Sequence, residues 1–308
     1  RFWDLASERE EARIDACVGL VRDLSRASDG DGDGGGGADA KDARDSARAS
    51  GRDDGNDDGN DGCDDAVTYA LRRLTRGLSS GRGGARQGFA LALSELARGA
   101  TAKLTPGQAL EALDANVAPI TKSTKGSEIR DIFLGRLFGA GAVARALQGG
   151  GGGSDEERAR CGGDVARRAR AVAMEKMHLA EPAAACVIEL KSSLGVELFG
   201  TVVEREPSIR EWLSADCSEK GGAETVWLAC ELYDALPNSV REKITCVPMT
   251  TKKTSGKKAA KAGARGDGVD WSEMFTRTHL KKISNALLEA SYTHPRMHSA
   301  WEMLIREA

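Results

Sequence analysis

A repetitive acidic stretch is the first candidate for metal chemistry. Residues 29–34 alternate Asp with Gly and match positions 1, 3, 5 and 6 of a calcium-binding loop. Position 12 of such a loop needs a bidentate Glu, but Ala40 stands there. Because a tract biased toward Asp and Gly produces such matches by chance, the sequence predicts no calcium site.

Two histidines, His294 and His298, are four residues apart, a spacing that could place them on one helix face. No Glu follows the first in a HExxH arrangement, and the nearest cysteine, Cys246, is far away in the sequence. We therefore expect surface or capping histidines around the turn at Pro295 rather than zinc ligands.

No residue pattern typical of an active site or a cofactor site is present. No Ser lies in a G-x-S-x-G elbow, and residues 255–258 (SGKK) do not complete a GxxxxGK[ST] phosphate loop. No apolar run approaches the roughly 20 residues that a membrane helix needs. The sequence thus predicts a protein that is not an enzyme, with no cofactor, no small-molecule substrate and no membrane span.

Basic residues are the strongest functional signal. Residues 252–265 hold six cations and no acid, as expected of a nuclear-localisation signal, a phosphate-contacting arm or a solvated insertion. A second group lies in two predicted helices, where ordinary solvated helix faces are the competing interpretation. The candidate nucleic-acid or localisation residues are Lys252, Lys253, Lys257, Lys258, Lys261 and Arg265, together with Arg72, Arg73, Arg76, Arg82 and Arg86.

The overall composition favours helices. Aromatic residues make up only 5% of the 308 residues, while Ala, Leu, Glu and Arg, which lose little freedom in a helix, dominate outside the Gly-rich tracts. Residues 28–65 contain 13 Asp against 4 Lys or Arg, so the rest of the chain carries about +6 although the whole carries −3. Seven scattered cysteines without a CxxC pair indicate buried, reduced thiols.

Apolar stripes at helical spacing divide the chain into about ten helices. The first is expected over residues 4–27, with Ile14, Cys17 or Val18, Val21 and Leu24 inward. An antiparallel pair is expected over residues 64–78, with Val67, Leu71, Leu74 and Leu78 in one apolar row, and 85–96. Thr105 with Gln108, and Ser154 with Glu157, form capping-box signatures. Asp270 is expected to cap one long helix whose apolar residues are Phe275, Ile283, Leu287 and Leu288. Gly162-Gly163 is expected to weaken the helix that starts after Ser154.

The prediction is an all-α fold, an armadillo/HEAT-like solenoid of stacked helix pairs over residues 1–308, with a non-repeating helical domain left open. Three insertions interrupt it: a disordered Asp/Gly tract at 28–65, a Gly-rich tract at 148–154 and a basic tract at 250–268. The missing initial Met and an apparent helix at the end suggest a segment of a longer protein.

Several stretches resemble one known family. They are FWDLAS (2–7), YALRRLTRGLSSGRGGARQGFALALSEL (69–96), IFLGRLFGAGAVARAL (132–147), TVWLACELYDALP (225–237) and HPRMHSAWEMLI (294–305). In this order they look like the N-terminal portion of the DNA polymerase V / Myb-binding protein 1A family, with the blocks at 69–96 and 132–147 the most specific.

The resemblance implies a protein of the nucleus and nucleolus with armadillo-type repeats. It implies roles in ribosomal RNA gene transcription, ribosome production and transcriptional co-regulation, with transcription factors and other nuclear proteins as partners, and with ribosomal DNA or pre-rRNA as possible ligands. The family name also implies DNA polymerase activity, which we keep as an alternative. An importin-like adaptor is a further alternative, although only isolated Trp212, Trp227, Trp271 and Trp301 stand where it would need regular rows of Asn and Trp.

Overall fold

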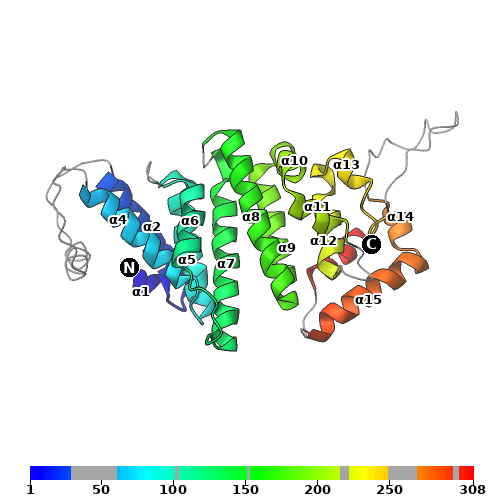
Figure 1. Ribbon diagram of the computed structural model, residues 1–308, viewed down its shortest axis with the longest axis horizontal. Coiled ribbons are helices and arrows are strands. Elements are labelled where there is room, and N and C mark those ends of the chain that lie inside the picture. The colour runs from blue at the N-terminus through cyan, green and yellow to red at the C-terminus, as the bar shows by residue number, and fades with distance from the viewer. Residues whose placement is uncertain (29–60, 101–103, 151–152, 216–221, 249–268, 294–297) are drawn as a thin grey trace. The chain divides into compact units, whose positions relative to one another are not determined.

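The computed structural model describes residues 1–28, 61–100, 104–150, 153–215, 222–248, 269–293 and 298–308 (Figure 1). Within these ranges the ordered elements are helices and no residue belongs to a β-strand, which confirms the all-α prediction. The chain divides into two compact units, Arg1–Ala146 and Leu147–Ala308.

The first unit stacks its helices around α5 (Gly83–Glu95), which packs against α2 (Glu10–Ser28), α4 (Asp61–Gly77) and α7 (Gly126–Ala146). Two smaller helices complete it: α1 (Phe2–Leu5) contacts α2 and α5, and α6 (Pro106–Asn116) contacts α4 and α7. Because only five residues join α4 to α5, these two helices run antiparallel, as predicted. Such side-by-side packing of successive helices is the arrangement expected of a helical solenoid.

A close backbone approach fixes α1 against α5. A Cβ atom at Gly88 would lie 2.0 Å from the main-chain oxygen of Leu5, so only glycine fits at this position. Leu5 itself is fully buried, as are Leu74 of α4 and Leu93 of α5. The short N-terminal helix is therefore part of the core of this unit.

The predicted helix over residues 4–27 is wrong in two respects. It is broken between α1 and α2, where the Ser7 hydroxyl accepts a hydrogen bond from the Arg9 amide at 3.2 Å. The predicted inward residue Ile14 is 44% exposed, and of the alternatives Cys17 and Val18 only Cys17 is buried, since Val18 is 50% exposed. The buried face of α2 instead includes small residues that a search for large apolar side chains overlooks. The buried residues of α2 are Ala16, Cys17, Gly19, Leu20 and Leu24.

The second unit has α8 (Asp155–Glu175) and α9 (Ala180–Leu194) as its main pair, joined by a 3-10 turn at Met177–Leu179. The short connection makes them antiparallel. The helices that follow are α10 (Val196–Arg205), α11 (Pro207–Leu213), α12 (Ala223–Leu232), α13 (Asn238–Arg241), α14 (Trp271–Met274), α15 (Arg277–Thr293) and α16 (Ser299–Glu307). Among them α10 packs on α8 and α9, while α12 packs on α9, α15 and α16.

Both predicted capping boxes are confirmed. The Thr105 hydroxyl accepts from the Gln108 amide at 3.2 Å, and the Gln108 side chain accepts from the Thr105 amide at 2.9 Å. Ser154 and Glu157 make the same reciprocal pair at 3.3 and 2.8 Å. These caps satisfy amide groups that the first turn of a helix leaves without partners.

Two expectations for the second unit are corrected. Asp270 caps a helix by accepting from the Glu273 amide at 3.1 Å, but this helix is only the four-residue α14, and α15 starts separately at Arg277. Phe275 lies between the two helices and is only half-buried, and Leu288 of α15 is 63% exposed instead of inward, whereas Ile283 and Leu287 are buried as predicted.

The glycine pair of α8 has a packing role. A Cβ atom at Gly162 would lie 3.0 Å from Leu194 of α9 and 3.3 Å from Val202 of α10. Both glycines of the pair are buried, and α8 is continuous through them. The absence of a side chain lets three helices approach closely, so tertiary packing offsets the low helix propensity of glycine.

The predicted insertions fall largely outside the described residues. This holds for residues 29–60, 151–152 and 249–268. At their edges, Ser28 is the last residue of α2, α4 already begins at Asp61, and Gln148–Gly150 forms a single 3-10 turn.

Candidate polyanion-binding surface

Three of the predicted basic residues share the solvent side of α4. Leu74 and Leu78 are fully buried, whereas Arg72, Arg73 and Arg76 are exposed. Residues three and four apart lie on one face of a helix, so Arg76 lies beside both other arginines. We call Arg72, Arg73 and Arg76 the α4 arginine stripe.

The stripe lacks carboxylate partners. Arg72 and Arg76 make no ion pair with any residue that the structure describes, and the guanidinium of Arg73 lies 5.5 Å from the centre of the Phe2 ring. This ring forms an edge contact with Tyr69, with centroids 6.1 Å apart. The cation–π contact orients Arg73 but leaves its positive charge uncompensated. The stripe therefore presents three cations to solvent.

Arg86, predicted to be in the same group, lies in a different environment. Its guanidinium donates to the main-chain oxygen of Ser80, lies 3.6 Å from the Asp131 carboxylate and stands over the Phe138 ring at 5.8 Å. The Arg86 side chain is only 12% exposed. Arg86 thus links the turn before α5 to α7, and its positive charge is paired with Asp131 inside the unit. Arg82, by contrast, is exposed where α5 begins.

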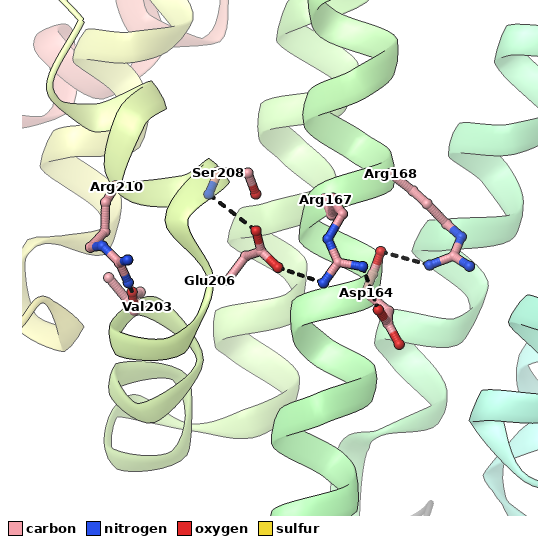
Figure 2. Close-up of polar contacts among 7 residues, drawn as sticks. All are labelled: Asp164, Arg167, Arg168, Val203, Glu206, Ser208 and Arg210. Carbon is pink, nitrogen blue, oxygen red and sulfur yellow. Dashed lines mark hydrogen bonds and ion pairs between the residues drawn. The ribbon is translucent and has the colours of Figure 1, made fainter.

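Two arginines of α8, Arg167 and Arg170, differ from the stripe because they pair with acids, and Figure 2 shows the contacts of Arg167. Arg167 donates to Asp164 and to Glu206, each at 2.8 Å. Arg170 donates to Glu211 of α11 at 2.6 Å. These contacts hold α8 to the segment that links α10 to α11, and they leave little charge for a ligand.

Glu206 is the centre of this arrangement. Its side chain is 6% exposed, and it accepts hydrogen bonds from Arg167 and, at 3.1 Å, from the Ser208 amide at the start of α11. Burial by itself would raise the pKa of Glu206, but the hydrogen bonds from Ser208 and Arg167 outweigh it and lower the pKa below its ordinary value of 4.5. Glu206 is thus a charged, buried helix cap.

The remaining predicted basic residues lie outside the described ranges. They are Lys252, Lys253, Lys257, Lys258, Lys261 and Arg265. The calcium-like residues 29–34 and His294 also lie outside. His298 does cap a helix, as expected: its Nδ1 accepts from the Ala300 amide at 3.1 Å at the start of α16.

Two buried thiols, those of Cys17 and Cys161, do not have the properties of activated nucleophiles. Burial raises the pKa of Cys17 to about 11 and that of Cys161 to about 12. Reactive thiols need the opposite shift, because the thiolate is the nucleophile. Over the described ranges, no three His, Cys, Asp or Glu side chains gather closely enough to hold a metal ion.

A groove of about 630 Å³ lies where α8 and α10 begin. Two of its three carboxylates are engaged: Asp155 pairs with Arg158 at 2.8 Å and Glu156 with Arg205 at 2.5 Å, whereas Glu197 makes no ion pair with a described residue. The lining thus holds three acids against one arginine, and that arginine is already paired, so the groove does not attract an anionic ligand.

Comparison with known families decides the relationship. The model of the family described as DNA polymerase phi matches residues 69–308, which include the α4 arginine stripe and the whole second unit. The chain belongs to the DNA polymerase phi family. Comparisons with curated proteins and with solved structures gave no match. Membership agrees with the resemblance drawn from the sequence blocks at 69–96 and 132–147.

None of the helices in the described ranges has both the length and the apolar character that crossing a bilayer requires.

Sequence analysis overlooked one group of exposed cations. They lie on α15 and are Arg277, Lys281 and Lys282. Their i and i+4 spacing was visible in the sequence, but only the exposed side of the helix distinguishes them from paired cations.

Proposed function

We propose that this chain is a helical scaffold, without catalytic activity of its own, that binds nucleic acid through the α4 arginine stripe. The observation that carries the proposal is the absence of carboxylate partners for Arg72 and Arg76 within the described residues. Phosphates are the anions that such a row of arginines binds best, because each guanidinium offers several donors to oxygen.

Membership of the family supports a proposal for where in the cell, and in which process, this chain acts. We place the protein in the nucleolus, in ribosomal RNA gene transcription and ribosome production, with transcription factors and other nuclear proteins bound to its helical surface. Ribosomal DNA or pre-rRNA is the proposed nucleic-acid ligand. The description DNA polymerase phi is consistent with contact to DNA. Residues 252–265 are the proposed nuclear-localisation signal.

The test measures binding of the whole chain to labelled RNA and DNA over a range of salt concentrations. Replacing all three stripe residues (R72Q, R73Q, R76Q) is expected to weaken binding and to lower the slope of log K against log salt by about 0.9 for each lost phosphate contact. The matched control removes three exposed arginines of the second unit, Arg160, Arg205 and Arg306. Equal affinities and slopes for the two triple variants would remove the stripe from the proposal.

Catalysis is tested separately, because the family description states DNA synthesis. The purified chain is assayed for templated nucleotide incorporation with magnesium. We expect none. Metal-dependent synthesis that a single Asp substitution abolishes would replace the scaffold proposal with a polymerase.

A further inference from the structure

The second unit carries an aromatic pair at its surface. Trp271 and Phe275 lie one helical turn apart, their ring centres are 6.3 Å apart and their planes differ by 26°, so the rings are stacked. Both side chains are partly exposed, whereas Met274 between them is fully buried. Met274 therefore anchors α14, and the two rings remain accessible at the surface.

Cations follow the aromatic pair directly. Arg277, Lys281 and Lys282 are exposed in the first half of α15, on the side away from the buried Ile283 and Leu287. As in the α4 arginine stripe, none of the three makes an ion pair with a residue that the structure describes. Their charges are therefore available to an anionic ligand.

Two acids lie near this surface. The Asp270 carboxylate accepts from the Glu273 amide at 3.1 Å and from the Ser272 hydroxyl at 2.5 Å, so it is used as a helix cap. The carboxylate of Glu273 is exposed and opposes an anionic ligand. With three cations against these two acids, charge alone gives weak attraction. The aromatic rings must therefore supply part of the affinity.

From this juxtaposition we infer that Trp271, Phe275, Arg277, Lys281 and Lys282 form a binding surface for single-stranded nucleic acid. Aromatic faces stack on bases of any sequence, and neighbouring cations hold the phosphates that link those bases. Bases in a duplex are already stacked and paired, so they cannot reach the rings. The surface selects single strands, a preference that a charged stripe alone cannot produce.

The inference goes beyond the proposed function and does not depend on it, because the α4 arginine stripe belongs to the other unit. The full chain is titrated with a labelled single-stranded RNA of about 16 nucleotides and with a duplex of the same length. The variant W271L is expected to weaken binding of the single strand about ten-fold and to change duplex binding less than about two-fold. W271F, which keeps an aromatic face, is expected to restore most of the affinity.

Further variants distinguish a loss of base stacking from a loss of folding and from binding through the α4 arginine stripe. F275L is a second test of stacking, and E273Q is expected to tighten binding of the single strand. Circular dichroism establishes that each variant is folded. The same ten-fold loss must occur in the background that lacks the α4 arginine stripe. Unchanged binding in both W271L and F275L, or equal losses for single strand and duplex, would overturn the inference.

Discussion

Helices α4 and α8 are both rich in arginine, yet Arg167 and Arg170 of α8 pair with acids whereas the α4 arginine stripe does not. On α8, Arg167 and Arg170 reach carboxylates 39 and 41 residues further along the chain. On α4, Arg72 and Arg76 have no carboxylate partner among the described residues. The presence of arginines on a helix therefore does not indicate a ligand surface. An arginine is available to a ligand only where no neighbouring segment of the fold places a carboxylate beside it.

The two arrangements also differ in what they contribute to stability. An exposed ion pair contributes little, about 0–1 kcal/mol, since water and salt screen it. A buried carboxylate with several donors contributes more, because its removal leaves those donors without an acceptor. Within this comparison, Glu206 should matter most for stability and the α4 arginine stripe least.

The largest expected effect is that of E206A. It removes the cap of α11 and the acceptor of Arg167, so we expect the free energy of unfolding to fall by about 2–3 kcal/mol. Urea denaturation followed by circular dichroism measures this change. The control is E211A, whose pair with Arg170 is exposed and should contribute at most about 1 kcal/mol. Similar losses for both variants would contradict the special role of Glu206.

A smaller effect is expected for R86Q. This change removes a mostly buried guanidinium from Asp131 and from the Ser80 carbonyl, and it should cost about 1–2 kcal/mol. R76Q, at an exposed position of the stripe, should change the free energy of unfolding by less than about 0.5 kcal/mol. The same denaturation experiment compares them. A substantial loss in R76Q would mean that the stripe has a structural role.

The smallest effect is a pH dependence. The pKa of Glu206 is lower in the folded chain than in the unfolded chain, so its charged form adds stability above the unfolded value of 4.5. This contribution is lost as the pH falls through the folded pKa. The stability difference between the wild type and E206Q should therefore shrink between about pH 6 and about pH 3. A constant difference over this range would show that Glu206 does not titrate as expected.

The sequence by itself determined the helical class of the fold and the starts of the helices that have a local capping signal. Thr105 with Gln108 and Ser154 with Glu157 are local signals, because a cap and its partner lie three residues apart. The helical spacing of Val67, Leu71, Leu74 and Leu78 predicted the buried side of α4 for a similar reason, and all but the half-buried Leu71 are buried. The family, too, was recognised from contiguous blocks of sequence.

Only the tertiary structure decided which charged residues are free. Arg72 and Arg86 looked alike in the sequence, but the partner of Arg86 is Asp131, which comes from another helix. Glu206 had no local signal, since burial and Arg167 define it. The low helix propensity of Gly162 predicted a weakened α8, but in the folded chain Leu194 and Val202 pack directly against this glycine. Local patterns fix caps and helix faces, whereas ion pairing and burial depend on residues far apart in the chain that only folding brings together.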